Sequence, residues 1–146
     1  MMVCTFFGHR DCYGLEPMML QHTIEEVIKN GVDTFYVGNQ GSYDSMVIGC
    51  LKRLKEIYPQ ISYTVVLAYL PTQKEEGDSY HGCSLYPEGL ETVPPRFAIE
   101  KRNRWMIDQA DYCICYVNHA YGGAYKFSCM AKRRGLTVMN LGSAEL

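Results

Sequence analysis

Two adjacent glycines near the end of the chain have the types and spacing to bind an anion. Gly122 and Gly123 lie between an apolar run, DYCICYVN, and the segment AYKFSCMAKRR, whose basic end is typical of a helix C-terminus. Glycine has no Cβ, so its N–H group can approach a phosphate closely, and a helix start favours negative charge. The motif alone leaves open whether it binds a phosphate or is a tight turn with no ligand. It is neither a Walker loop nor a full G-x-G-x-x-G.

Polar residues also follow two earlier apolar runs, in GHRDCYG (8–14) and GNQGSYD (38–44). Arg10 can hold a phosphate as a planar fork or form a surface ion pair. His9 can act as a proton donor or hydrogen-bond to the backbone. Asp44 is suited to a ribose hydroxyl and equally to capping a nearby helix. The candidate ligand-binding or phosphate-binding residues are Gly8, His9, Arg10, Gly38, Asn39, Gly41, Asp44, Arg102, Asn118, Gly122 and Gly123.

Alternating strand and helix patterns supply the elements that must position these residues. We expect strands at 2–7, 33–38, 61–70, 111–118 and 136–141, and helices at 17–30, 47–58, 97–109 and 123–135. The strands are apolar on both faces, which is typical of a parallel sheet covered by helices on each side. The prediction is one α/β, Rossmann-like domain over residues 1–146. Its five-stranded, mostly parallel sheet has the order 3-2-1-4-5.

That strand order places the loops after strands one and four side by side at the switch point, where open parallel sheets bind ligands. The loop after strand two lies next to them. Residues 71–95 break the pattern and hold four of the six prolines, so we expect a long loop there. It is a lid over a bound base, an ordered surface loop or an oligomer contact, and these alternatives stay open.

Composition excludes several classes of protein. The net charge of -2 and the scattered Lys and Arg residues argue against general nucleic-acid binding. No apolar run approaches the roughly 20 residues that cross a bilayer. From this and from an N-terminus, MMVCTFFGHR, that lacks the pattern of a secretion signal, we expect a cytoplasmic location. The seven cysteines contain no C-x-x-C pair, so we expect reduced thiols and no metal site. Homo-oligomerisation is left open.

Four motifs, FFGHR, GNQGSYD, KRNRWMIDQAD and GGAYK, occur in order over nearly the whole chain. Together they resemble the SLOG superfamily, which joins the SMF/DprA proteins and the LOG (Lonely Guy) phosphoribohydrolases and includes the YpsA-like bacterial proteins. The resemblance implies a Rossmann-like fold that binds a nucleotide or a nucleotide-derived ligand, such as an adenine nucleotide or an NAD-derived compound. We expect no required cofactor.

The motif residues can be carried over one by one. Arg102 stands nine residues before Asp111, as an Arg does in Lonely Guy enzymes. Gly122 and Gly123 match the paired glycines of P-G-G-x-G-T-x-E-E, but Ser128 stands where that motif has its catalytic Glu. The resemblance therefore favours ligand binding or sensing over the Lonely Guy reaction.

The alternative is an enzyme that cleaves an N-glycosidic bond, as a nucleotide hydrolase or a deoxyribosyltransferase-like transferase. Such a reaction builds positive charge on the sugar and needs a carboxylate beside it. Asp44 and Glu100 are the candidate catalytic carboxylates, although no pattern in the sequence places either at a sugar carbon. The SMF/DprA branch also suggests DNA handling, which the negative net charge disfavours.

Overall fold

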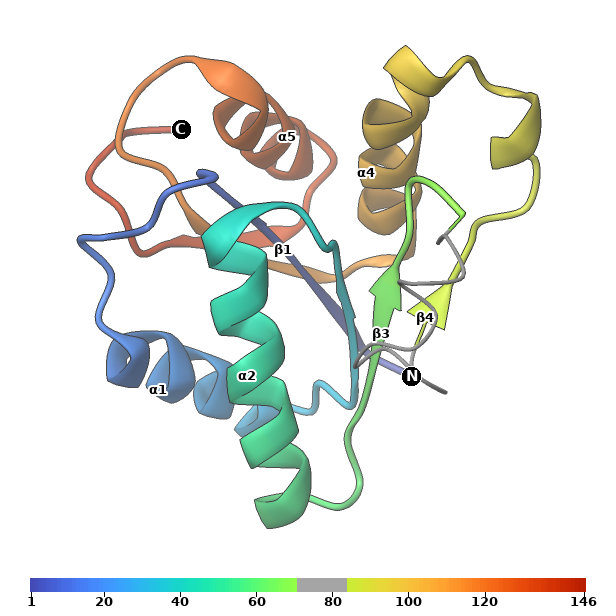
Figure 1. Ribbon diagram of the computed structural model, residues 1–146. Helices are drawn as coiled ribbons and strands as arrows, with labels where there is room; N and C mark the ends of the chain where they lie inside the picture. Colours follow the sequence, from blue (N-terminus) through green and yellow to red (C-terminus); the bar gives the residue numbers. More distant parts are fainter. Residues whose placement is uncertain (71–83) are drawn as a thin grey trace.

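The computed structural model describes residues 1–70 and 84–146 and contains a six-stranded sheet in the order β4-β3-β2-β1-β5-β6 (Figure 1). The strands are β1 (Val3–Gly8), β2 (Thr34–Val37), β3 (Ser62–Val66), β4 (Ser84–Leu85), β5 (Tyr112–Tyr116) and β6 (Thr137–Asn140). Every pairing between neighbours is parallel. The α/β class and the Rossmann-like arrangement are confirmed, because the expected order 3-2-1-4-5 corresponds to β3-β2-β1-β5-β6.

The expected number of five strands was wrong by one. Val65 and Val66 of β3 pair with Ser84 and Leu85, so β4 extends the sheet at its edge. Two residues are too few to show a hydrophobic period, and their extended conformation comes from the pairing itself. In the described part of the expected loop a 3-10 helix, η1, spans Leu90–Thr92, and a second, η2 (Pro95–Phe97), begins at the last residue of that loop. The lid prediction falls in part on residues 71–83, which lie outside the described residues.

Helices cover both faces of the sheet. Figure 1 shows α1 (Pro17–Lys29) and α2 (Gly41–Ile57) on one side, and α4 (Ala98–Gln109) and α5 (Gly122–Arg133) on the other. Each pair buries its own apolar cluster against the sheet. Within the described residues no helix is long and apolar enough to cross a membrane, and every cysteine there is a free thiol.

The register of β1 and β5 brings their exits together. Gly8 is aligned with Tyr116, and the N–H of His9 donates to the carbonyl of Tyr116 at 3.2 Å. The N-terminal turn of α2 reaches this point because residue 8 has no side chain: a Cβ there would lie 2.2 Å from the ring of Tyr43. Tyr43 is held in place because its hydroxyl donates to the carbonyl of Ile114 at 2.8 Å.

The exits of β1 and β2 also pack tightly. Gly41 has a φ of +89°, and a Cβ on it would lie 2.8 Å from the Cα of Arg10. The N–H of Ser42 donates to the carbonyl of Arg10 at 2.8 Å. Three loops therefore meet at the carboxyl edge of the sheet, where the sequence predicts a ligand site.

Candidate functional site

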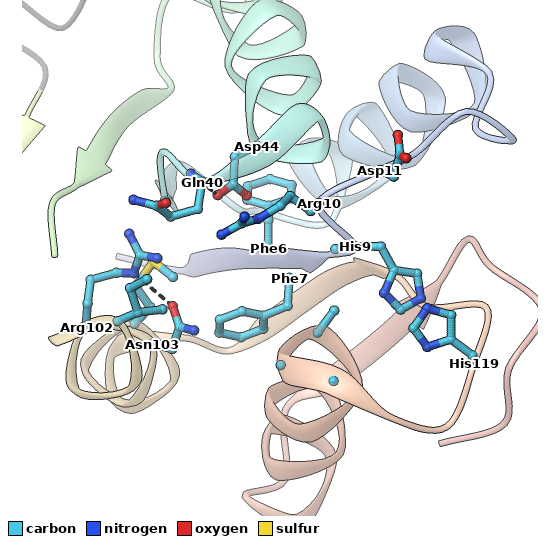
Figure 2. Close-up of a pocket in the computed structure, with 17 residues that line it drawn as sticks. Phe6, Phe7, His9, Arg10, Asp11, Gln40, Asp44, Arg102, Asn103 and His119 are labelled. Carbon is cyan, nitrogen blue, oxygen red and sulfur yellow. Dashed lines mark hydrogen bonds between the residues drawn. The ribbon is translucent and has the colours of Figure 1, made fainter. Parts of the chain in front are cut away.

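A cavity of about 460 Å³ opens at this edge of the sheet (Figure 2). Its walls come from the end of β1, from the loops that follow β1, β2 and β5, from the first turns of α2 and α5, and from α4 between Ile99 and Met106. Eight of the predicted binding residues line it: Gly8, His9, Arg10, Gly38, Asp44, Arg102, Gly122 and Gly123. Segments far apart in the chain thus converge as the strand order predicts.

Three predicted residues do not line the cavity and have structural contacts instead. The side-chain oxygen of Asn39 accepts a hydrogen bond from Gln40 Nε2 at 3.3 Å. Gly41 permits the close approach of the two loops. The side-chain oxygen of Asn118 accepts hydrogen bonds from the N–H and the hydroxyl of Ser143, at 2.9 and 3.2 Å, and so anchors the C-terminal segment.

Arg102 lies at one end of the cavity and is only 2% exposed. Its Nε donates to Asn103 Oδ1 at 2.8 Å, and its Nη1 donates to the carbonyl of Val66 at 2.9 Å. Arg104, two positions along the same helix, is exposed and pairs with Glu100. This agrees with the helical rule that residues two apart do not share a face.

Asp44 faces Arg102 across Gly38. A Cβ on Gly38 would lie 2.9 Å from Arg102 Nη1 and 2.9 Å from Asp44 Oδ2, so glycine leaves a gap of one methyl group between the two charges. Asp44 also accepts the N–H of Gln40, the residue before α2, at 2.9 Å. Of the two roles that the sequence left open for Asp44, the structure shows the contact with the start of α2, and binding of a ribose hydroxyl stays a prediction.

Burial controls the ionisation of Asp44. The side chain is 7% exposed, and burial raises its pKa to about 6. The hydrogen bond from Gln40 and the charge of Arg102 lower the pKa and offset part of that rise. Asp44 can therefore change charge near neutral pH, which suits a proton donor or acceptor.

Several polar atoms at this end are free for a ligand. Arg102 Nη2, Asn103 Nδ2 and Asp44 Oδ1 have no hydrogen-bond partner among the described residues. Among the described residues, Ser128 Oγ is the one side-chain nitrogen or oxygen that is both fully buried and without a hydrogen-bond partner. Arg102 Nη2, Asn103 Nδ2 and Asp44 Oδ1 are therefore not fully buried, and they are accessible from the cavity that their residues line.

The opposite end of the cavity carries a stack of rings. His9 and His119 lie 3.8 Å apart between ring centroids, and Tyr121 continues the stack 3.9 Å from His119. The N–H of Asn118 donates to His9 Nε2 at 2.8 Å, so neutral His9 carries its proton on Nδ1. Burial lowers the pKa of His9, and the neighbouring His119 lowers it further.

The start of α5 borders the same end. Gly122 has a φ of +88°. Apart from the adjacent residues and the backbone of α5, no atom of the described residues lies within 4 Å of a Cβ built on Gly122 or Gly123. No side chain caps this helix. The N–H groups of its first turn have no acceptor in residues 1–70 and 84–146. Arg10, exposed on the adjacent loop, makes no ion pair in that part of the chain.

Glu100, the second candidate catalytic carboxylate, is not in the cavity wall. It binds Lys126 at 2.9 Å and Arg104 at 3.2 Å. The hydrogen bond from Lys126, followed by that from Arg104, lowers its pKa. Asp44 is therefore the candidate carboxylate that the fold places where a ligand can reach it.

Sequence reasoning missed several lining residues: Phe6, Phe7, Asp11, Gln40, Ile99, Asn103, Met106, His119 and Ala124. The apolar lining residues have the same spacing as core residues, so the sequence pattern could not distinguish a residue that lines a cavity from one that packs in the core. Asn103 and His119 did carry a signal, since each is a polar residue beside a predicted binding residue. A comparison with protein-family models found no match, and neither did a search of curated proteins.

Proposed function

We propose that this chain binds a nucleotide or a nucleotide-derived ligand, such as an adenine nucleotide or an NAD-derived compound, as its resemblance to the SLOG superfamily implies. One observation carries the proposal. A single cavity at the switch point of a parallel sheet joins the uncapped N-terminus of α5 to a buried, partly unsatisfied guanidinium, that of Arg102.

The dimensions and chemistry of the cavity support this proposal. Its volume lies within the roughly 300–1,000 Å³ typical of small-molecule sites. Phe6, Phe7, Ile99 and Met106 supply apolar wall, and a few polar groups converge on it. The free N–H groups of α5 suit an anionic group. A nucleotide combines such an anion with a large, less polar remainder.

Isothermal titration calorimetry tests the proposal directly. The purified chain is titrated with AMP, GMP, CMP, UMP, NAD and ADP-ribose at pH 8. We expect saturable binding of at least one ligand with a stoichiometry near one, and weaker binding by Gly123→Ala. Absence of heat and of any shift in melting temperature with all six ligands contradicts the proposal.

The position of Asp44 also favours a second candidate, cleavage of an N-glycosidic bond. This carboxylate lines the cavity, and its pKa of about 6 suits general acid–base chemistry. Release of free base from nucleoside monophosphates, followed by chromatography, tests the reaction. Asp44→Asn should abolish release, whereas Glu100→Gln should not, because Glu100 lies outside the cavity wall. No release by the wild-type protein excludes this activity for these substrates.

A further inference from the structure

We propose that the two ends of the cavity divide the ligand between them, an inference that rests on the proposed function. The end formed by Arg102, Asn103 and Asp44 takes an uncharged group that both donates and accepts hydrogen bonds. The anionic group is held at the other end, by the N-terminus of α5. Arg102, which was expected to contact phosphate, instead positions the nucleoside part.

The buried charges at the Arg102 end, one positive and one negative, already balance each other. Asp44 faces Arg102 across the gap at Gly38, and the two side chains are 7% and 2% exposed. A phosphate dianion bound to Arg102 would lie beside a buried, ionised carboxylate, where water screens the repulsion poorly. An uncharged group meets no such repulsion.

The free atoms at this end also match an uncharged group. Two guanidinium nitrogens of Arg102, Nε and Nη1, already donate to protein oxygens, so Nη2 is the nitrogen left without a partner among the described residues. Arginine commonly grips phosphate through two parallel N–H groups. The free set is two donors, Arg102 Nη2 and Asn103 Nδ2, and one acceptor, Asp44 Oδ1. A phosphate dianion only accepts and leaves Asp44 without a donor.

The opposite end offers donors to an anion. The first-turn N–H groups of α5 are free in the described chain, and space is open beside Gly122 and Gly123. Arg10 is exposed, and Figure 2 shows its guanidinium turned away from this end, toward Gln40 and Asp44. Asp11 is the acidic residue that lines this end, and it is exposed, so solvent and salt screen its charge. Figure 2 shows this end, with His9 and His119, separated from Arg102 and Asn103 by the length of the cavity.

Two sources offer hydroxyl-like or amide-like groups that both donate and accept: the sugar hydroxyls and the edge of the base. Both are uncharged, and both fit the free atoms at the Arg102 end. The ligands used in the experiment distinguish them, because a dideoxynucleoside lacks the hydroxyls and ribose 5-phosphate lacks the base.

The test is the substitution Asp44→Asn at pH 8, where Asp44 is ionised, with binding measured by calorimetry. The probes are the four nucleoside monophosphates of the panel, the nucleoside of the tightest binder and its 2′,3′-dideoxy form, ribose 5-phosphate, and inorganic phosphate. We expect the substitution to weaken nucleotide and nucleoside equally, by about tenfold, as expected for one hydrogen bond to a charged group. Binding of inorganic phosphate should be unchanged.

If an anion instead binds at the Arg102 end, Asp44→Asn should change the affinity in the opposite direction. Removal of the Asp44 charge would then strengthen binding of nucleotide and of inorganic phosphate, and either result overturns the inference. Glu100→Gln is the matched control, since it removes the same charge outside the cavity wall and should change no affinity. The amide oxygen of an asparagine at position 44 can still accept the N–H of Gln40, which retains the helix cap.

A second variant keeps the inference testable if Asp44→Asn does not fold. Gly123→Ala should weaken nucleotide binding but leave the nucleoside unchanged, and equal weakening of both overturns the division. If the 2′,3′-dideoxynucleoside binds equally to wild type and Asp44→Asn, the hydroxyls are the contacted group. If Asp44→Asn still weakens binding of the dideoxynucleoside about tenfold but does not weaken binding of ribose 5-phosphate, the contacted group is the edge of the base. Binding of no nucleotide by the wild-type protein refutes the proposed function itself.

Discussion

Gly123→Ala separates a role of Gly123 in binding from a role in folding. Gly123 lies in the first turn of α5, and its φ is not in the left-handed region. An added Cβ has no atom of the described residues within 4 Å, apart from the adjacent residues and the backbone of α5. Alanine therefore fits without strain. Replacement of a helical glycine at a compatible site should raise the free energy of unfolding by roughly 0.5–1 kcal/mol. The melting temperature should then rise by about 1–4 °C.

The same methyl group should impair binding. It occupies the open space beside the N–H groups of α5, so an anion can no longer approach the amide of residue 123. A hydrogen bond to a charged group is worth about 1.5–3 kcal/mol. The dissociation constant for a nucleotide should therefore rise about tenfold to a hundredfold.

Gly49→Ala is the matched control. Gly49 lies within α2 and does not line the cavity, and a Cβ there would make an ordinary contact of 3.6 Å with Arg53 Nη1. It should stabilise the fold by a similar amount and leave affinity unchanged. The affinity for nucleotide is measured by calorimetry and the melting temperature by thermal unfolding, for the wild-type protein, Gly123→Ala and Gly49→Ala. Unchanged nucleotide affinity in Gly123→Ala refutes the reasoning about α5, and a lower melting temperature refutes the steric argument.

Three further predictions concern stability. Gly38→Ala should lower the free energy of unfolding, measured by urea denaturation, by about 1–3 kcal/mol, because the new Cβ would lie 2.9 Å from Arg102 and from Asp44. Unchanged stability would mean that these two side chains can move apart freely. Gly8→Ala, whose Cβ would lie 2.2 Å from Tyr43, should destabilise more than Gly38→Ala in the same assay, and the reverse ranking contradicts the role given to Tyr43. The pKa of Asp44 is about 6 in the folded state and 3.8 in the unfolded chain, so the folded state binds more protons between these values and stability falls as pH rises through them. Asp44→Asn should lack this loss, on the order of 3 kcal/mol between pH 4 and pH 7, and an identical pH profile in both proteins argues against the raised pKa.

Most of the fold was predictable because its strands are continuous apolar runs. Runs such as those at 2–7 and 111–118 are long enough to show a pattern, and parallel sheets with helices on both faces follow from them. β4 was not predictable, because its two residues are extended only through their pairing with Val65 and Val66. Helical periodicity predicted that at most one of Arg102 and Arg104 enters the site, and the spacing of the resemblance, nine residues before Asp111, selected Arg102.

The site was predictable in its location and less so in its chemistry. Glycines after the strands pointed to the cavity, but Gly41 and Gly122 look alike in the sequence and differ in the structure. A Cβ at Gly41 would contact Arg10, whereas the space beside Gly122 is empty. A glycine in the sequence does not show which atoms lie next to it.

The sequence by itself determined the class of fold, the strand order of the sheet core and the edge at which polar loops gather. Local hydrophobic periodicity and chain connectivity are sufficient for these features. The tertiary structure alone decided that Asp44 lies across Gly38 from Arg102, that Glu100 pairs with Lys126 outside the cavity wall, and that His9 stacks on His119. Burial, charge balance and free hydrogen-bonding atoms depend on contacts between distant segments, and these contacts exist only once the sheet has formed.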